Sequence, residues 1–175
     1  MKFINPETIV ANMGLKPGSK VTDFGSGAGF YALAAAKVVG NNGRVAAVDV
    51  QDSKLTATKS ATVQKGYTNV EVYRADLEKP FDQIPHGGED GVILASILHE
   101  VKNREALLQN AYALLKSKGL LLVVDWQTEH SPFGPAMDKR ISVQDLRKMI
   151  EAMGMRHVKD LNGELYHYAM VFEKQ

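Results

Sequence analysis

The spacing of apolar and polar residues varies along the chain. Short continuous apolar runs predict buried strands, and longer stretches of mixed polarity predict helices. The expected strands lie at residues 20–24, 44–48, 70–74, 90–95 and 120–125. The expected helices lie at residues 6–13, 30–39, 52–65, 103–115 and 142–153. Because strands and helices alternate, and because the strands are apolar on both faces, the pattern favours a parallel sheet covered on both sides by helices.

The pattern changes after residue 125. Residues 126–141 lack helix or strand periodicity and contain two prolines and a glycine, which predicts a long loop that is functional or disordered. Two further strands, at 156–161 and 164–172, flank the turn signal Asn162-Gly163. We therefore expect an α/β fold whose sheet ends in an antiparallel pair.

Composition and charge narrow the possible functions. The 175 residues predict a single domain spanning residues 1–175. The net charge of +1 gives no support for a nucleic-acid partner. The absence of cysteine excludes disulfides, thiolate metal sites and a cysteine nucleophile. No apolar stretch has the length of a secretion signal or a membrane span, so we expect a cytoplasmic protein.

A glycine-rich turn joins the first expected strand to the helix that follows it. Gly25, Gly27 and Gly29 lie in this turn, and Asp23 lies two residues before it. Such a turn brings bare backbone close to a ligand, and the helix N-terminus adds free N–H groups and partial positive charge. Residues 27–32 also satisfy the dinucleotide pattern G-x-G-x-x-A. However, the Asp23 carboxylate would repel a pyrophosphate and attract a cationic ligand.

Two further acids lie at strand ends. Asp49 ends the second strand, where a carboxylate can accept hydrogen bonds from both hydroxyls of a ribose. Asp76 follows the third strand and can accept from an exocyclic amine such as adenine N6. One acid at a strand end is often only solvated or caps the next helix. Three such acids beside a triple-glycine turn favour a cationic ligand that contains a ribose and an adenine.

These motifs resemble those of class I S-adenosylmethionine-dependent methyltransferases over nearly the whole chain. Residues 21–29 resemble the first motif of that family, 45–49 its second-strand motif and 74–77 its adenine-binding position. Residues 90–100 resemble its fourth strand with the following loop, and 114–120 resemble the segment that leads into its fifth strand. The resemblance implies a Rossmann-like, doubly wound, mostly parallel seven-stranded sheet with an antiparallel last strand and helices on both faces. It also implies S-adenosyl-L-methionine as the cofactor.

The resemblance implies roles for single residues. Asp23 and the glycines position the methionine part of the cofactor, and Asp49 takes the ribose hydroxyls. Asp76 meets the adenine amine, the Leu77 backbone meets a ring nitrogen, and residues 96–99 line the pocket near the sulfonium. The expected cofactor-binding residues are Asp23, Gly25, Gly27, Gly29, Asp49, Val50, Asp76, Leu77 and Ser96.

Methyl transfer from a sulfonium is a direct displacement, so it needs a base only when the acceptor is poorly ionised. His99 and His130 are the candidate bases, because an unperturbed imidazole titrates at about 6.5. Each has a plainer interpretation, since His99 can simply line the pocket and His130 can be solvated in the long loop. Asp125, Glu129 and His130 can form a metal site, but loop carboxylates near a histidine are common and we expect no metal.

We expect no appended recognition domain, so acceptor contacts must come from the N-terminal segment, the loop after the fourth strand and residues 126–141. The candidate acceptor-binding residues are Tyr31, Glu100, Trp126 and Arg140. Trp126 can stack on an acceptor or merely cover the sheet edge. The short chain favours a small-molecule acceptor, and the sequence leaves the oligomeric state open.

Several other classes are weighed against this interpretation. Arsenic and cytosine-C5 methyltransferases use cysteine thiols, which the chain lacks. Residues 95–98 do not carry the Asn/Asp-Pro-Pro-aromatic signature of enzymes that methylate amino groups of DNA and protein. Two alternatives remain open: an S-adenosylmethionine-binding or partner-dependent subunit without catalysis, and an NAD-type oxidoreductase.

Overall fold

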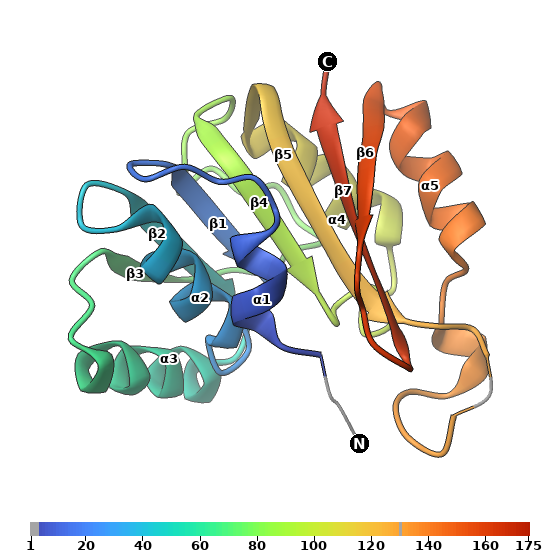
Figure 1. Ribbon diagram of the computed structural model, residues 1–175, viewed down its shortest axis with the longest axis horizontal. Coiled ribbons are helices and arrows are strands. Elements are labelled where there is room, and N and C mark those ends of the chain that lie inside the picture. The colour runs from blue at the N-terminus through green and yellow to red at the C-terminus, as the bar shows by residue number, and fades with distance from the viewer. Residues whose placement is uncertain (1–3, 130) are drawn as a thin grey trace.

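The computed structural model describes residues 4–129 and 131–175. It has one seven-stranded sheet with the strand order β3-β2-β1-β4-β5-β7-β6 (Figure 1). The strands are β1 Lys20–Phe24, β2 Arg44–Asp49, β3 Val70–Arg74, β4 Glu89–Ala95, β5 Leu115–Trp126, β6 Met155–Leu161 and β7 His167–Lys174. The helices are α1 Pro6–Ala11, α2 Phe30–Val39, α3 Asp52–Lys65, α4 Arg104–Leu114 and α5 Val143–Ala152, with a short 3₁₀ helix at Met137–Lys139.

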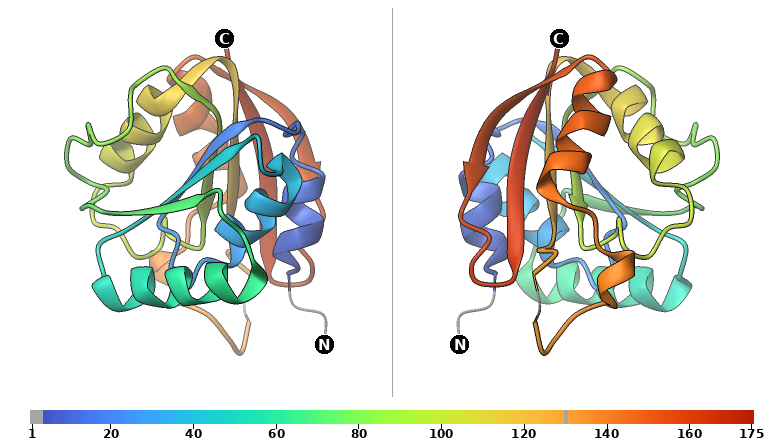
Figure 2. Two further views of the ribbon diagram at one scale, coloured as in Figure 1. Left: turned by 90° about the vertical axis from the view of Figure 1, so that its left-hand side faces the viewer. Right: turned by 90° about the vertical axis from the view of Figure 1, so that its right-hand side faces the viewer.

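The sheet topology confirms the expected doubly wound fold. Strands β1 to β5 pair in parallel, and β7 pairs antiparallel with both β5 and β6. Helices α1 and α2 cover one face of the sheet, and α4 and α5 cover the other (Figure 2). Both faces of the central strands are therefore buried, which explains their continuous apolar sequences. A single domain over residues 1–175 stays a prediction, although all seven strands share one sheet.

Local sequence signals place most helix ends correctly. Asn5 caps α1, because its side chain accepts from the backbone N–H groups of Glu7 and Thr8. The helix ends at Ala11, two residues before the expected end. Ser142 caps α5 through the N–H of Asp145, as a helix beginning near residue 142 requires.

Two strands begin more than two residues away from the predicted position. Strand β5 begins at Leu115 rather than at 120, because Leu115 pairs with Glu89 and a bulge follows, with Lys118 at φ 65°. Strands β6 and β7 form the expected hairpin, but its turn is longer than the two residues Asn162-Gly163. Residues 164–166 belong to a longer turn, and β7 begins only at His167. Long-range pairing across the sheet, which the local sequence does not encode, decides both boundaries.

The parallel strands all end at one edge of the sheet, the edge at which the arrow of β4 ends in Figure 1. We call it the carboxyl edge. It carries the glycine turn after β1, the loop after β4 and the long loop after β5. Because the last pair is antiparallel, the turn between β6 and β7 reaches the same edge. Residues 127–141 are irregular apart from the 3₁₀ helix, as expected where the structure describes them.

Candidate cofactor and acceptor site

The glycine turn at the carboxyl edge depends on backbone that only glycine adopts readily. Gly25 has φ 97°, and a Cβ there would lie 2.9 Å from Cγ1 of Ile97. Gly29 has φ 86° and caps α2, and its Cβ would lie 2.8 Å from Thr58. Gly27, at φ 52°, has nothing within 4 Å of the position that a Cβ would take, so its outer side faces open space. The turn therefore packs tightly at both ends and is open in its middle.

Asp49 closes the other side of this turn. Its side chain is buried, its Oδ2 accepts from the Gly27 N–H at 2.9 Å, and its Oδ1 accepts from the Gln51 N–H at 2.9 Å. These bonds tie the glycine turn to the end of β2. Each carboxylate oxygen retains a further lone pair, so Asp49 can also accept hydrogen bonds from ligand hydroxyls.

Asp23 is a fully buried carboxyl group with an unpartnered oxygen. Its Oδ2 has no hydrogen-bond partner, and the Tyr31 hydroxyl and the Ser26 hydroxyl are also buried without partners. Burial, to which the charge of Asp49 adds, raises the pKa of Asp23 to about 7 against the opposing backbone hydrogen bond of Ala32. Burial also raises the pKa of the Tyr31 phenol. Because buried polar atoms are normally paired in native proteins, this cluster is typical of a ligand site.

A pocket of about 430 Å³ opens onto these groups, within the size range of small-molecule sites. The expected cofactor-binding residues that line it are Asp23, Gly25, Gly27, Asp49 and Ser96. Tyr31 and Glu100, which were expected to contact the acceptor, line it as well. Sequence reasoning missed Gln51 and Lys54, which carry no motif of their own, whereas Ile97 lies in the segment 96–99 that was expected to line the pocket.

The remaining expected cofactor residues do not line this pocket. Gly29 lies behind it against Thr58, and the Val50 side chain is exposed. Asp76 accepts from the Glu78 N–H at 3.1 Å and pairs with Lys79 at 3.1 Å, and both contacts lower the pKa of Asp76. Leu77 is buried in the core. Whether these four residues contact a cofactor stays a prediction.

Ser96 has an unusual backbone. It follows β4, has φ 54°, and donates its N–H to the carbonyl of Val124 at 2.8 Å. A residue other than glycine in this region costs about 1–3 kcal/mol, and such strain is concentrated at functional sites. The sequence carries no signal for it.

His99 and Asp125 form a pair beside the pocket. The Nδ1 of His99 lies 2.8 Å from Oδ1 of Asp125, and the His99 ring is mostly buried. Asp125 also accepts from the backbone N–H groups of Leu98 and Trp126. His99 does not line the pocket, but the next residue, Glu100, does. The other candidate base, His130, lies outside the described residues.

Trp126 and Arg140 are engaged within the protein. The Trp126 ring lies against the His167 ring, with centroids 4.1 Å apart. The buried Arg140 guanidinium donates five hydrogen bonds to loop carbonyls, those of Gln127, Glu129, Phe133 and Pro135. Because a guanidinium has five N–H donors, this arrangement leaves none for an acceptor. Arg140 instead holds the loop after β5 in shape.

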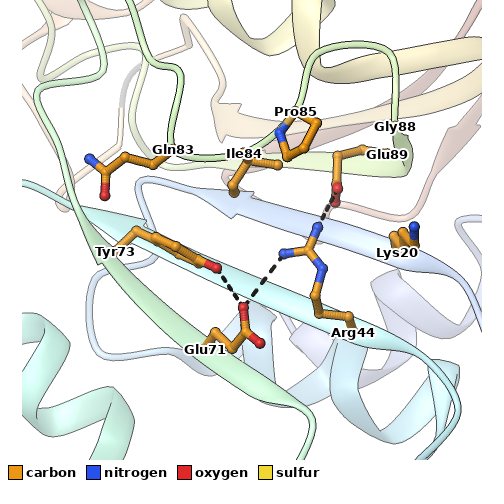
Figure 3. Close-up of a pocket in the computed structure, with 9 residues that line it drawn as sticks. All are labelled: Lys20, Arg44, Glu71, Tyr73, Gln83, Ile84, Pro85, Gly88 and Glu89. Atoms are coloured by element: carbon orange, nitrogen blue, oxygen red, sulfur yellow. Dashed lines mark hydrogen bonds and ion pairs between the residues drawn. The ribbon is translucent and has the colours of Figure 1, made fainter.

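A second pocket lies at the opposite edge of the sheet, where the strands begin (Figure 3). It has a volume of about 260 Å³, and four of its polar residues pair with one another, namely Arg44, Glu71, Tyr73 and Glu89. The buried Glu89 carboxylate accepts from the Thr22 hydroxyl at 3.0 Å and pairs with Arg44. Glu71 accepts from the Tyr73 hydroxyl. A ligand would have to compete with these contacts, so the carboxyl edge is the better candidate site.

Two further features are absent from the residues that the structure describes. Across residues 4–129 and 131–175, no three His, Asp or Glu side chains lie together in a group that can hold a metal ion. In the same part of the chain, no helix has the length and apolar character of a membrane span.

Comparison with known proteins places the chain among methyltransferases. A family model described as a methyltransferase domain matches residues 15–168. The ubiquinone/menaquinone biosynthesis C-methyltransferase UbiE of Ectopseudomonas mendocina is 34% identical over 68% of this chain and 46% of that protein. UbiE of Neisseria meningitidis serogroup A is 33% identical over 88% of this chain and 59% of that protein. The chain thus spans about half the length of these relatives.

Solved structures share the same fold. A SAM-dependent methyltransferase from Aquifex aeolicus has a TM-score of 0.89 and 27% identity, and the match covers 99% of this chain and 91% of that one. The [4+2]-cyclase SpnF has a TM-score of 0.80 at 14% identity over 96% of this chain and 79% of that one. The second match shows the fold alone, and its name shows that the fold by itself does not specify the reaction.

Proposed function

The chain belongs to the class I S-adenosylmethionine-dependent methyltransferase family, and on that premise we propose that it transfers a methyl group from S-adenosylmethionine to a small-molecule acceptor. The observation that carries the proposal is the unpartnered Oδ2 of Asp23 in a pocket that also presents Asp49 and the open side of Gly27.

The residues present fit this cofactor. The Asp23 carboxylate can accept from the ammonium group of the methionine part, which would supply the partner that Oδ2 lacks. Asp49 has free lone pairs for the two ribose hydroxyls, next to the backbone of Gly27. No side chain at Gly27 blocks the approach of the ligand to the turn.

The same charges argue against the NAD-type alternative. A dinucleotide would bring its pyrophosphate to the glycine turn, where Asp23 and Asp49 both lie. When they are ionised, two carboxyl groups beside the turn repel a phosphate that is bound there. They attract a ligand that carries positive charge on an ammonium and a sulfonium.

The proposed reaction needs few chemical groups from the protein. When bound, the cofactor supplies an electrophilic methyl group on a sulfonium. Residues around the pocket align the acceptor and exclude water, which can account for most of the acceleration. For an acceptor that must lose a proton, His99 receives it at Nε2. The bound cofactor would supply the methyl carbon to the electron pair freed on the acceptor and would keep the pair of its S–C bond on sulfur, so the chain would only have to hold the two in line and take up the proton.

The names of the relatives suggest a class of acceptor but not one compound. UbiE is named as a C-methyltransferase of ubiquinone and menaquinone biosynthesis. We propose an acceptor with an electron-rich ring that loses a proton on methylation, for which a base is useful. Tyr31 and Glu100 line the pocket, which supports them as candidate contacts of such an acceptor.

A transfer assay tests the proposal. The purified chain is incubated with S-adenosylmethionine and a panel of hydroquinones, phenols and primary amines, and S-adenosylhomocysteine is measured by mass spectrometry. We expect acceptor-dependent product with one or more hydroquinones or phenols. Cofactor binding without product from any acceptor would favour the non-catalytic subunit instead.

A further inference from the structure

We propose that Asp125 is a positioning residue that keeps the proton of neutral His99 on Nδ1, so that Nε2 is free to accept a proton. The role of Nε2 as a base rests on the proposed methyl transfer. The tautomer of His99 does not, because it depends only on the protein. It gives a role to Asp125, a buried acid that the cofactor site does not use.

The contacts of Asp125 define the tautomer. Its buried carboxylate lies at the end of β5 and accepts from the Leu98 N–H at 3.0 Å and the Trp126 N–H at 2.8 Å. The third contact is His99 Nδ1, 2.8 Å from Oδ1. An ionised carboxylate accepts hydrogen bonds and cannot donate them, so the ring nitrogen that faces it must carry the proton. In the neutral imidazole, Nε2 then has the free lone pair.

The second ring nitrogen, Nε2, lies near Glu100, a residue that lines the pocket. Strand β4 pairs with β5 up to Ala95 and Val124, so the loop after β4 lies against the end of β5, where Asp125 stands. Nε2 of His99 lies 3.9 Å from Oε1 of Glu100. Glu100 lines the pocket that contains Asp23 and Asp49. Nε2 therefore lies next to a residue that lines the pocket, although His99 itself does not line it.

Charged groups from several elements surround His99. Asp125 of β5 and Glu100 of its own loop present two negative charges to the ring. Arg104 of α4 binds the Leu98 carbonyl at 2.8 Å, and Arg140 lies in the loop after β5. His167 of β7 is the other imidazole in this region. Burial lowers the pKa of His167; the charge of Asp125 opposes this shift, and the charges of His99 and Arg140 add to it. His99, and not His167, is the imidazole whose ring nitrogen contacts the Asp125 carboxylate.

A purely structural role for Asp125 is the competing interpretation. The same carboxylate holds two backbone N–H groups, so it could serve only to shape the loop after β4. The tautomer of His99 distinguishes the two roles. If Asp125 only holds the loop, its replacement in a folded variant leaves the tautomer unchanged.

Nitrogen-15 NMR of the histidine rings tests the proposal without any acceptor. The full chain is labelled at histidine and studied with bound S-adenosylhomocysteine across a pH titration, and His99→Asn assigns the His99 signal. We expect neutral His99 in the wild type to be protonated at Nδ1. We expect Asp125→Asn to shift it toward the Nε2-protonated form. A wild-type signal protonated at Nε2, or an unchanged tautomer in a folded Asp125→Asn variant, would overturn the proposal.

The chain offers a matched control. His157 Nε2 lies 2.8 Å from Oδ1 of Asp160 on the surface, so Asp160→Asn removes a similar pair elsewhere. It should leave the His99 signal unchanged. With an acceptor from the transfer assay, Asp125→Asn should lower kcat about tenfold or more, with the cofactor Kd within about twofold of the wild type. If methyl transfer itself fails, turnover is absent in every variant while the tautomer of wild-type His99 is still measured.

Discussion

The buried acids at the two edges of the sheet differ in whether the protein supplies them with partners. At the edge where the strands begin, Glu89 is buried but binds Arg44 and Thr22 (Figure 3). At the carboxyl edge, Asp23 is buried with an unpartnered oxygen, beside a second carboxylate, Asp49. The first arrangement pairs its buried acid with a cation, whereas in the second no described residue hydrogen-bonds to Oδ2 of Asp23. Buried polar groups that satisfy one another maintain a fold, and those left unsatisfied indicate what the protein binds.

The pKa values express the same contrast. Burial raises the pKa of both acids. For Glu89, the charge of Arg44 and the hydrogen bond from Thr22 oppose this rise. For Asp23, the neighbouring charge of Asp49 adds to it. The surroundings, not the depth of burial, distinguish the two sites.

The largest effect should come from breaking the paired edge. Arg44→Met leaves the Glu89 carboxylate buried without its cation, which we expect to cost about 3–5 kcal/mol of folding stability at pH 8. Urea denaturation measures the loss. The loss should shrink as the pH falls and Glu89 takes up a proton. An unchanged stability at pH 8 would mean that the pair contributes nothing.

The unpaired edge should respond in the opposite direction. Because the pKa of Asp23 is about 7 in the folded chain against 3.8 in the unfolded one, its ionised form is penalised by folding. The stability of the ligand-free protein should therefore fall as the pH rises from about 4 to about 7 and then level off. Asp23→Asn should remove this fall and stabilise the ligand-free protein at pH 8 by on the order of 3 kcal/mol. The same variant should bind S-adenosylmethionine more weakly.

Asp52→Asn is the control for this variant. Asp52 is exposed and pairs with Arg74 at 3.3 Å, so its replacement should change stability by less than about 0.5 kcal/mol. Denaturation of the three proteins at pH 5 and pH 8 makes the comparison. A loss of stability in Asp23→Asn at pH 8 would contradict the predicted cost of burying the ionised Asp23 carboxylate.

Filling the open side of the glycine turn should abolish cofactor binding. A valine at Gly27 projects into the pocket, where we expect a weakening of about a hundredfold or more, equivalent to about 3 kcal/mol. Gly66→Val imposes a similar backbone penalty at φ 71° in open space at the end of α3. Calorimetric titration should show normal affinity for the control. Retained affinity in Gly27→Val would place the cofactor elsewhere.

The smallest effect concerns the ribose acid. Asp49→Ala should weaken cofactor binding by about 1–3 kcal/mol, since the ligand hydroxyls lose their acceptor. Asp82→Ala, an exposed acid in the segment between β3 and β4, should bind normally. Equal affinity of folded Asp49→Ala and the wild type would refute the ribose assignment.

Much of this architecture could be predicted from the sequence, because helix ends and buried strands leave local signals. The bounds expected for α2, α3, β1 and β3 agree with the structure. Strand β5 and the turn before β7 did not follow the prediction, because their ends depend on partners far along the chain.

The site shows the same division. Asp23, the glycines and Asp49 belong to continuous motifs and were found by reading along the chain. The contact between His99 and Asp125 joins residues 26 positions apart and depends on the register of two strands. Arg140 was a candidate acceptor contact, but the sequence gives no sign that loop carbonyls use all its donors.

One measurement tests the central claim that the unpaired carboxyl edge is an S-adenosylmethionine site. The wild-type chain is titrated by calorimetry with S-adenosylmethionine, S-adenosylhomocysteine and NAD. The account predicts dissociation constants on the order of micromolar for the first two and no heat from NAD. Binding of NAD alone, or silence from all three, would contradict it.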